Sequence, residues 1–87
     1  MAVFYPGDKF TLKVVEVGSM LSGEFTAKEA MDRAFELEHE LDASIDVYVV
    51  GNDRDPVAGC AFGEFFVYQP HDEDGNSLQI PPWPAQP

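Results

Sequence analysis

One segment, residues 26–42, constrains the fold of this 87-residue chain more than any other. Thr26 and Glu29 have the spacing of a capping box, in which the threonine hydroxyl accepts the N–H of Glu29 and the glutamate carboxylate accepts the N–H of Thr26. Apolar residues then recur at intervals of three and four: Ala27, Ala30, Met31, Ala34, Leu37 and Leu41. This periodicity predicts a helix of about four turns that buries one face against a sheet.

The segment before this helix has the alternating pattern of a strand. Residues 10–17 alternate between apolar and polar side chains at first, and they are rich in β-branched residues. Residues 18–23 are expected to connect this strand to Glu24 and Phe25, which run back beside it. The pattern therefore predicts a hairpin ahead of the helix.

Two more extended segments follow the helix. Residues 45–50 alternate cleanly and end in a run of turn formers at residues 51–56. Residues 57–68 predict a single further strand, antiparallel to the previous one, in which Gly59 and Gly63 indicate a bulge or an irregular start.

The predicted class is α+β, with a three- to four-stranded, mainly antiparallel sheet and one helix packed on one face, in the order β-β-α-β-β. A single helix cannot cover both faces, so the second face is expected to be solvated or used for contact. We expect residues 1–68 to form one domain. Residues 69–87 hold five of the seven prolines and predict a Pro-rich acidic tail, extended or partly disordered. Within it, Trp83 either folds back onto the exposed sheet face, frays, or belongs to a polyproline II segment that binds a groove.

The charge of the chain is unbalanced. Sixteen acidic residues against five basic ones give a net charge of −11, and from Glu24 onward fourteen acids face three bases. Such a chain is repelled by polyanions, which argues against direct binding to nucleic acid or to an anionic membrane. A basic partner protein is the kind of partner that this charge favours.

The same sequence predicts a cytoplasmic protein. Cys60 is the only cysteine, so no disulfide within the chain is possible and a reducing compartment is expected. Residues 1–8 lack the pattern of a signal peptide, and no apolar run is long enough for a transmembrane helix.

Four acids recur along one side of the predicted helix: Glu29, Asp32, Glu36 and Glu40. Their spacing places successive carboxylates about 5–6 Å apart along the axis, comparable with phosphates along a nucleic-acid strand. The row therefore predicts a decoy of a nucleic-acid backbone, although an ordinary solvated helix face has the same composition.

No group of residues predicts catalysis or a metal site. Cys60 and His39 have no motif that pairs them, and a buried structural thiol is the expected role of Cys60. His39 and His71 are the only histidines, and His39 lacks the second helical histidine of a zinc site. Residues 72–77 resemble part of a calcium loop, but prolines stand where its first and twelfth ligands would be. We expect a protein that is not an enzyme and has no cofactor.

The Thr-capped, alanine-rich helix followed by Ile45-Asp-Val-Tyr-Val49 in a compact acidic chain resembles small accessory proteins of phages and mobile elements, namely anti-CRISPR proteins and other DNA mimics. The resemblance covers residues 10–68 and is one of size, acidity and α+β outline. It implies a non-enzymatic inhibitor that occupies a basic nucleic-acid-binding surface of a target protein in the host cytoplasm, with the helix acids and the turn residues Asp53 and Asp55 as the candidate contacts. The chain itself is expected to be a monomer or a homodimer. The alternative is a small interaction module that forms a homodimer through its sheet, with acidity serving solubility.

Overall fold

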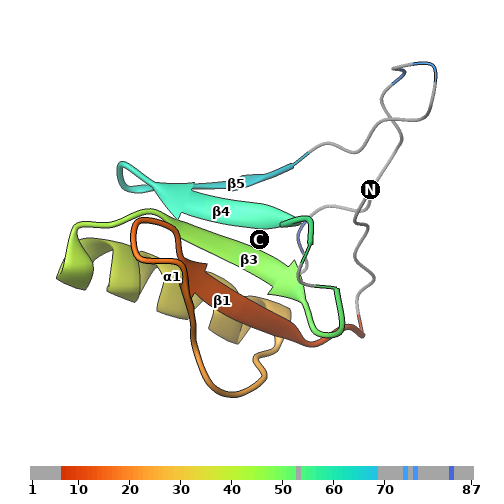
Figure 1. Cartoon of the computed structure of the whole chain (residues 1–87), viewed down its shortest axis with the longest axis horizontal. Coiled ribbons are helices and arrows are strands. Elements are labelled where there is room, and N and C mark those ends of the chain that lie inside the picture. Colours follow the sequence, from red (N-terminus) through yellow and green to blue (C-terminus); the bar gives the residue numbers. More distant parts are fainter. Residues whose placement is uncertain (1–6, 53, 69–73, 75, 77–82, 84–87) are drawn as a thin grey trace.

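The computed structural model describes residues 7–52, 54–68, 74, 76 and 83, and it has two layers: one helix and one antiparallel sheet (Figure 1). The strand order is β2-β1-β3-β4-β5. The elements are β1 (Phe10–Val14), β2 (Ser19–Met20), α1 (Ala27–Leu41), β3 (Ile45–Val49), β4 (Ala58–Ala61) and β5 (Glu64–Val67). The predicted α+β class with one helix on one face of the sheet is confirmed, with five strands where three or four were expected.

The capping box predicted for α1 is present. The Thr26 hydroxyl accepts the N–H of Glu29 at 3.3 Å, and the Glu29 carboxylate accepts the N–H of Thr26 at 2.9 Å. At the other end, Asp42 takes a left-handed conformation (φ 50°), and its N–H bonds to the carbonyl of Glu38. The helix therefore starts and stops where local side-chain chemistry directs it, within one residue of the prediction.

The centre of the sheet is the pairing of β1 with β3, in which Leu12 lies opposite Val47. Side chains alternate along both strands, so one face of each strand is apolar and buried. This face meets α1, which contacts four of the five strands: β1, β3, β4 and β5. The helix-covered face of the sheet is thus the core of the molecule.

The first hairpin is shorter than predicted. The first strand ends at Val14 instead of continuing through residue 17, because residues 15–18 form a turn that closes with a bond from the Gly18 N–H to the Val14 carbonyl. The short β2 lies inside the segment expected to be a connection. Phe25 does run back beside β1, as expected, and exchanges two backbone hydrogen bonds of 2.8 Å with Phe10.

The single strand predicted over residues 57–68 is wrong, since this segment folds as a hairpin of β4 and β5. Two residues, Phe62 (φ 53°) and Gly63 (φ 76°), form its turn, and Ala61 pairs with Glu64 across it. Gly63 signals this turn rather than the expected bulge. Phenylalanine rarely adopts the left-handed conformation, which is why the sequence pattern did not reveal the turn.

Trp83 belongs to the core although it is distant in sequence from its neighbours. It is 1% exposed, its ring centroid lies 4.9 Å from that of Phe10 and 5.3 Å from that of Phe65, and its Nε1–H donates to the carbonyl of Ala27 at 3.1 Å. Trp83 does fold back, which was one of the three alternatives, but the face expected for it is wrong, because it packs on the helix-covered face and not on the open one. The rest of the predicted tail lies outside the described residues apart from positions 74 and 76.

Within the described part of the chain, no helix has the length and apolar character that crossing a membrane requires.

We predict that Trp83→Ala lowers the free energy of unfolding by about 3–5 kcal/mol, because it removes a buried ring and leaves a cavity beside α1. Trp83→Phe, which keeps an aromatic ring but loses the bond to Ala27, should lose less. Circular dichroism during urea denaturation is the appropriate readout, since Trp83 is the only tryptophan. A loss below about 1 kcal/mol for Trp83→Ala would contradict the assigned packing.

Candidate functional site

The acidic row predicted on the helix is exposed, but three of its four carboxylates have partners on or beside the helix. The Glu29 carboxylate is part of the capping box, and its hydrogen bonds to Thr26 lower its pKa. Asp32 pairs with Lys28 at 2.8 Å, and Glu36 pairs with Arg33. Of the four acids, only Glu40 has neither a cation nor a capping partner among the described residues.

The structure does not bring all the predicted contact residues together. Glu29 and Glu40 lie eleven residues apart on α1, which corresponds to about 16 Å along the helix axis. Asp55 is exposed in the connection from β3 to β4, at the end of the sheet where α1 starts (Figure 1). Asp53 lies outside the described residues.

Three turns meet at the opposite end of the sheet. They are the β1–β2 turn, the connection from α1 to β3, and the β4–β5 turn (Figure 1). Between them lies an open hollow of about 340 Å³, which we call the turn-end surface. It is lined by Glu16, Glu38, Asp42, Ala43, Ser44 and Phe62.

Backbone hydrogen bonds hold two carboxylates of the turn-end surface in place. Both oxygens of Glu16 accept the N–H of Ser44, at 2.8 and 2.9 Å. Glu38 Oε1 accepts the N–H of Gly63 at 2.6 Å, which ties the β4–β5 turn to the helix. No Lys or Arg is among the residues that line this surface. It is therefore a fixed anionic region without a basic residue in its lining.

Phe62 projects from this surface. It is 99% exposed, and its left-handed backbone conformation costs of order 1–2 kcal/mol relative to an ordinary one. Glu16, Glu38, Asp42 and Phe62 were all missed as site residues in the sequence. The signal that could have found Phe62 is Gly63, which marks a two-residue hairpin turn when it is placed between two short strands.

The open face of the sheet carries a second distinct group of residues. Tyr68 donates a hydrogen bond to Asp46 at 3.3 Å, and Phe66 packs edge-on against Tyr68 with ring centroids 5.4 Å apart. Both rings cross Gly59, where an added Cβ would come within 2.9 Å of the Tyr68 hydroxyl oxygen and 3.2 Å of the Ile45 carbonyl oxygen. Glycine is thus required at this position for the aromatic pair to lie on the sheet.

Burial controls the acid–base behaviour of this group. It raises the pKa of Asp46 above its ordinary value, although the hydrogen bond from Tyr68 and the charge of Lys13 act in the opposite direction. Burial, together with the adjacent Asp46 carboxylate, raises the pKa of Tyr68 to about 12. Tyr68 is therefore a hydrogen-bond donor at neutral pH.

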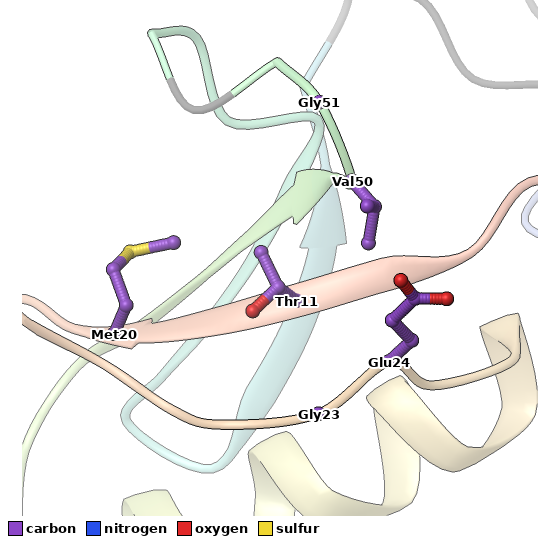
Figure 2. A pocket seen from close by; sticks show the side chains of 6 residues that line it. All are labelled: Thr11, Met20, Gly23, Glu24, Val50 and Gly51. Carbon is purple, nitrogen blue, oxygen red and sulfur yellow. The ribbon is translucent and has the colours of Figure 1, made fainter.

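A shallow hollow of about 550 Å³ lies beside β1, between the start of α1 and the end of β3. Figure 2 shows the six residues that line it: Thr11, Met20, Gly23, Glu24, Val50 and Gly51. The Thr11 hydroxyl donates a hydrogen bond to the carbonyl of Leu21 at 3.3 Å. Glu24 is the one ionisable side chain in the lining of this hollow. This lining provides no pair of groups for acid–base or nucleophilic chemistry.

The remaining reactive side chains of the described residues, Cys60 and His39, lie in different environments. Cys60 is buried in the core, as expected, and burial raises the pKa of its thiol to about 11. His39 is exposed on α1. Within the described residues, no three His, Cys, Asp or Glu side chains are arranged to hold a metal ion.

No protein-family model matches the chain, and no curated protein or solved structure matches it either. The candidate surfaces therefore rest on the geometry of this molecule alone.

We predict that Asp46→Asn raises the stability of the fold at neutral pH. A pKa raised by burial means that the charged carboxylate is disfavoured in the folded state, so wild-type stability falls as the pH rises through this pKa. The amide oxygen of asparagine can still accept the hydrogen bond that the Tyr68 hydroxyl donates. The gain should disappear below the ordinary carboxyl pKa of 3.8, where Asp46 is protonated in both states.

Urea denaturation of the wild type and of Asp46→Asn, from neutral pH to below pH 3.8, measures the difference between their free energies of unfolding. Asp32→Asn is the matched control, since it makes the same substitution at an exposed residue whose ion pair with Lys28 stabilises the helix slightly. A stability difference that does not change with pH would contradict the assignment to Asp46 titration.

Proposed function

We propose that this chain is a non-enzymatic binding protein that occupies a basic, nucleic-acid-binding surface of a target protein, in the manner of an anti-CRISPR protein or DNA mimic. The observation that carries the proposal is the turn-end surface, where three carboxylates line one hollow without a Lys or Arg. An acidic surface of this kind attracts a basic partner over a long range and competes with nucleic acid for its Lys and Arg side chains.

The choice between the helix row and the turn-end surface follows from their charge balance. Two acids of the row are paired with bases on the same helix, so their attraction for an external cation is reduced. The carboxylates of Glu16 and Glu38 accept backbone N–H groups, which orient them without cancelling their charge. We therefore place the contact at the turn-end surface.

Two triple variants with the same net charge test this placement. The first, Glu16→Gln/Glu38→Gln/Asp42→Asn, removes the charge of the turn-end surface but keeps its oxygen acceptors, and asparagine suits the left-handed conformation at position 42. The second, Asp32→Asn/Glu36→Gln/Glu40→Gln, is the matched control on the helix row. Each triple raises the net charge from −11 to −8.

The immobilised full chain should capture nucleic-acid-binding proteins from a cell extract at low salt, and duplex DNA or high salt should release them. We predict that the turn-end triple loses this capture and that the helix-row triple retains most of it. The reverse result would assign the contact to the helix row. Equal capture by all three proteins, or capture that DNA does not displace, would overturn the proposal.

The alternative function, a homodimer formed through the sheet, is favoured by one specific observation. β5 is the last strand in the sheet order, and Phe66 and Tyr68, on or beside it, are both 39% exposed. An edge strand with exposed aromatic residues is a surface on which a second strand can pair.

For this alternative, light scattering coupled to size-exclusion chromatography should give about twice the chain mass of 9.6 kDa. Val67→Pro, which removes an N–H that points away from β4 at the edge of the sheet, should then restore the monomer. A monomeric mass at every protein concentration would contradict the dimer.

A further inference from the structure

The geometry points to Phe62 as the anchor of a protein–protein interface, which inserts into an apolar pocket of the partner whose rim carries Lys and Arg side chains. This inference rests on the proposed function and specifies the shape and chemistry of the surface that the protein would bind.

The fold of the chain does not account for Phe62. It is 99% exposed, whereas the next most exposed phenylalanine among the described residues, Phe66, is 39% exposed. Its left-handed backbone (φ 53°) is a conformation that asparagine and glycine adopt more readily. The side chain therefore gains nothing from burial, and its backbone is strained. Strain that is retained at an exposed position is typical of binding sites.

The turn presents this ring in a defined position. Ala61 and Glu64 pair directly across the two-residue turn. The backbone that carries the ring therefore has little conformational freedom. The bond from the Gly63 N–H to Glu38 fixes the turn to the end of α1. An aromatic side chain held in this way loses little conformational entropy when it enters a pocket, and buried aromatic residues contribute most of the affinity in many interfaces.

Other exposed apolar side chains lie at the same end of the sheet. Val17, in the β1–β2 turn, is 71% exposed, and Leu41, the last residue of α1, is also exposed. They add exposed apolar area at the end of the molecule from which the ring protrudes.

The acids beside Phe62 determine the class of partner. Glu16, Glu38 and Asp42 line the same hollow as Phe62, and Glu64 follows it by two residues. A second copy of this chain would bring these carboxylates against each other, so the charge disfavours self-association. A pocket rimmed by Lys and Arg complements both the ring and its surroundings.

Phe62→Asn separates binding from folding. It creates the Asn-Gly pair that two-residue hairpin turns of this type prefer, so we expect a higher urea midpoint than in the wild type. A photo-reactive benzoylphenylalanine at position 62 identifies the contacted protein in an extract of the cells in which the chain naturally occurs. The same probe at position 50, at the other end of β3, is the control.

The cross-linked protein, once purified, is the probe for binding kinetics at several salt concentrations. We predict that Phe62→Asn raises the dissociation constant by about thirtyfold, mainly through faster dissociation. The salt dependence of binding should not change. The triple Glu16→Gln/Glu38→Gln/Asp42→Asn should instead slow association and flatten the salt dependence. Val50→Asn, a matched apolar-to-asparagine control, should bind like the wild type.

The outcomes distinguish the two proposals. If Phe62→Asn binds like the wild type and the acidic triple does not, the anchor is overturned and the proposed function stands. If both variants bind like the wild type, both proposals fall. If only Phe62→Asn is weakened, the basic rim and the proposed function are overturned. No cross-link at position 62, or a dimer that Phe62→Asn dissolves, also overturns this inference.

Discussion

The packing of a single alanine-rich helix face against the sheet is the contact on which the rest of the molecule depends. Ala27, Ala30 and Ala34 are buried at this contact, and their small side chains let the helix approach the strands closely. Trp83 supplies the large buried ring near the start of α1, where it contacts Phe10 and Phe65. The main apolar core therefore lies on one face, and the chain has no second helix among its described residues to cover the other.

This one-sided core determines how the open face is built. Its polar side chains form hydrogen bonds across strands, as Tyr68 does with Asp46. Its aromatic rings lie over Gly59, where the backbone would otherwise be exposed. An aromatic ring placed across from a strand glycine compensates for the missing side chain. In the part of the chain that the structure describes, the face is thus stabilised by side-chain contacts between neighbouring strands.

The parts of the fold that the sequence predicts are those that local chemistry decides. The capping box and the apolar stripe of α1 involve residues three or four positions apart, so they can be recognised without tertiary information. The partners of the helix acids, Lys28 and Arg33, are equally local, since each lies three or four residues from the acid that it pairs with. By contrast, Trp83 bonds to a residue 56 positions away, and Phe62 occupies a conformation that its residue type disfavours. The partner of Trp83 and the exposure of Phe62 cannot be predicted from pattern alone, although Gly63 marks the turn that holds Phe62.

The position of the charges is a stronger guide to function than their number. Acids that served only solubility would be placed where they cost the fold least, and the negative end of a helix dipole is an unfavourable place for them. Glu38 and Glu40 nevertheless lie in the last turn of α1, with Asp42 as its C-cap. The strained and exposed Phe62 lies at this same end of the molecule.

Two unfavourable features of unrelated physical origin therefore coincide, one electrostatic and one conformational. Each is compatible with a folded chain, and each becomes favourable when a basic, apolar-lined partner surface covers it, because the carboxylates gain cations and the ring gains a pocket. Diffuse acidity would account for neither the absence of Lys and Arg from the turn-end surface nor the choice of phenylalanine at position 62. The binding surface proposed at this end of the sheet accounts for both.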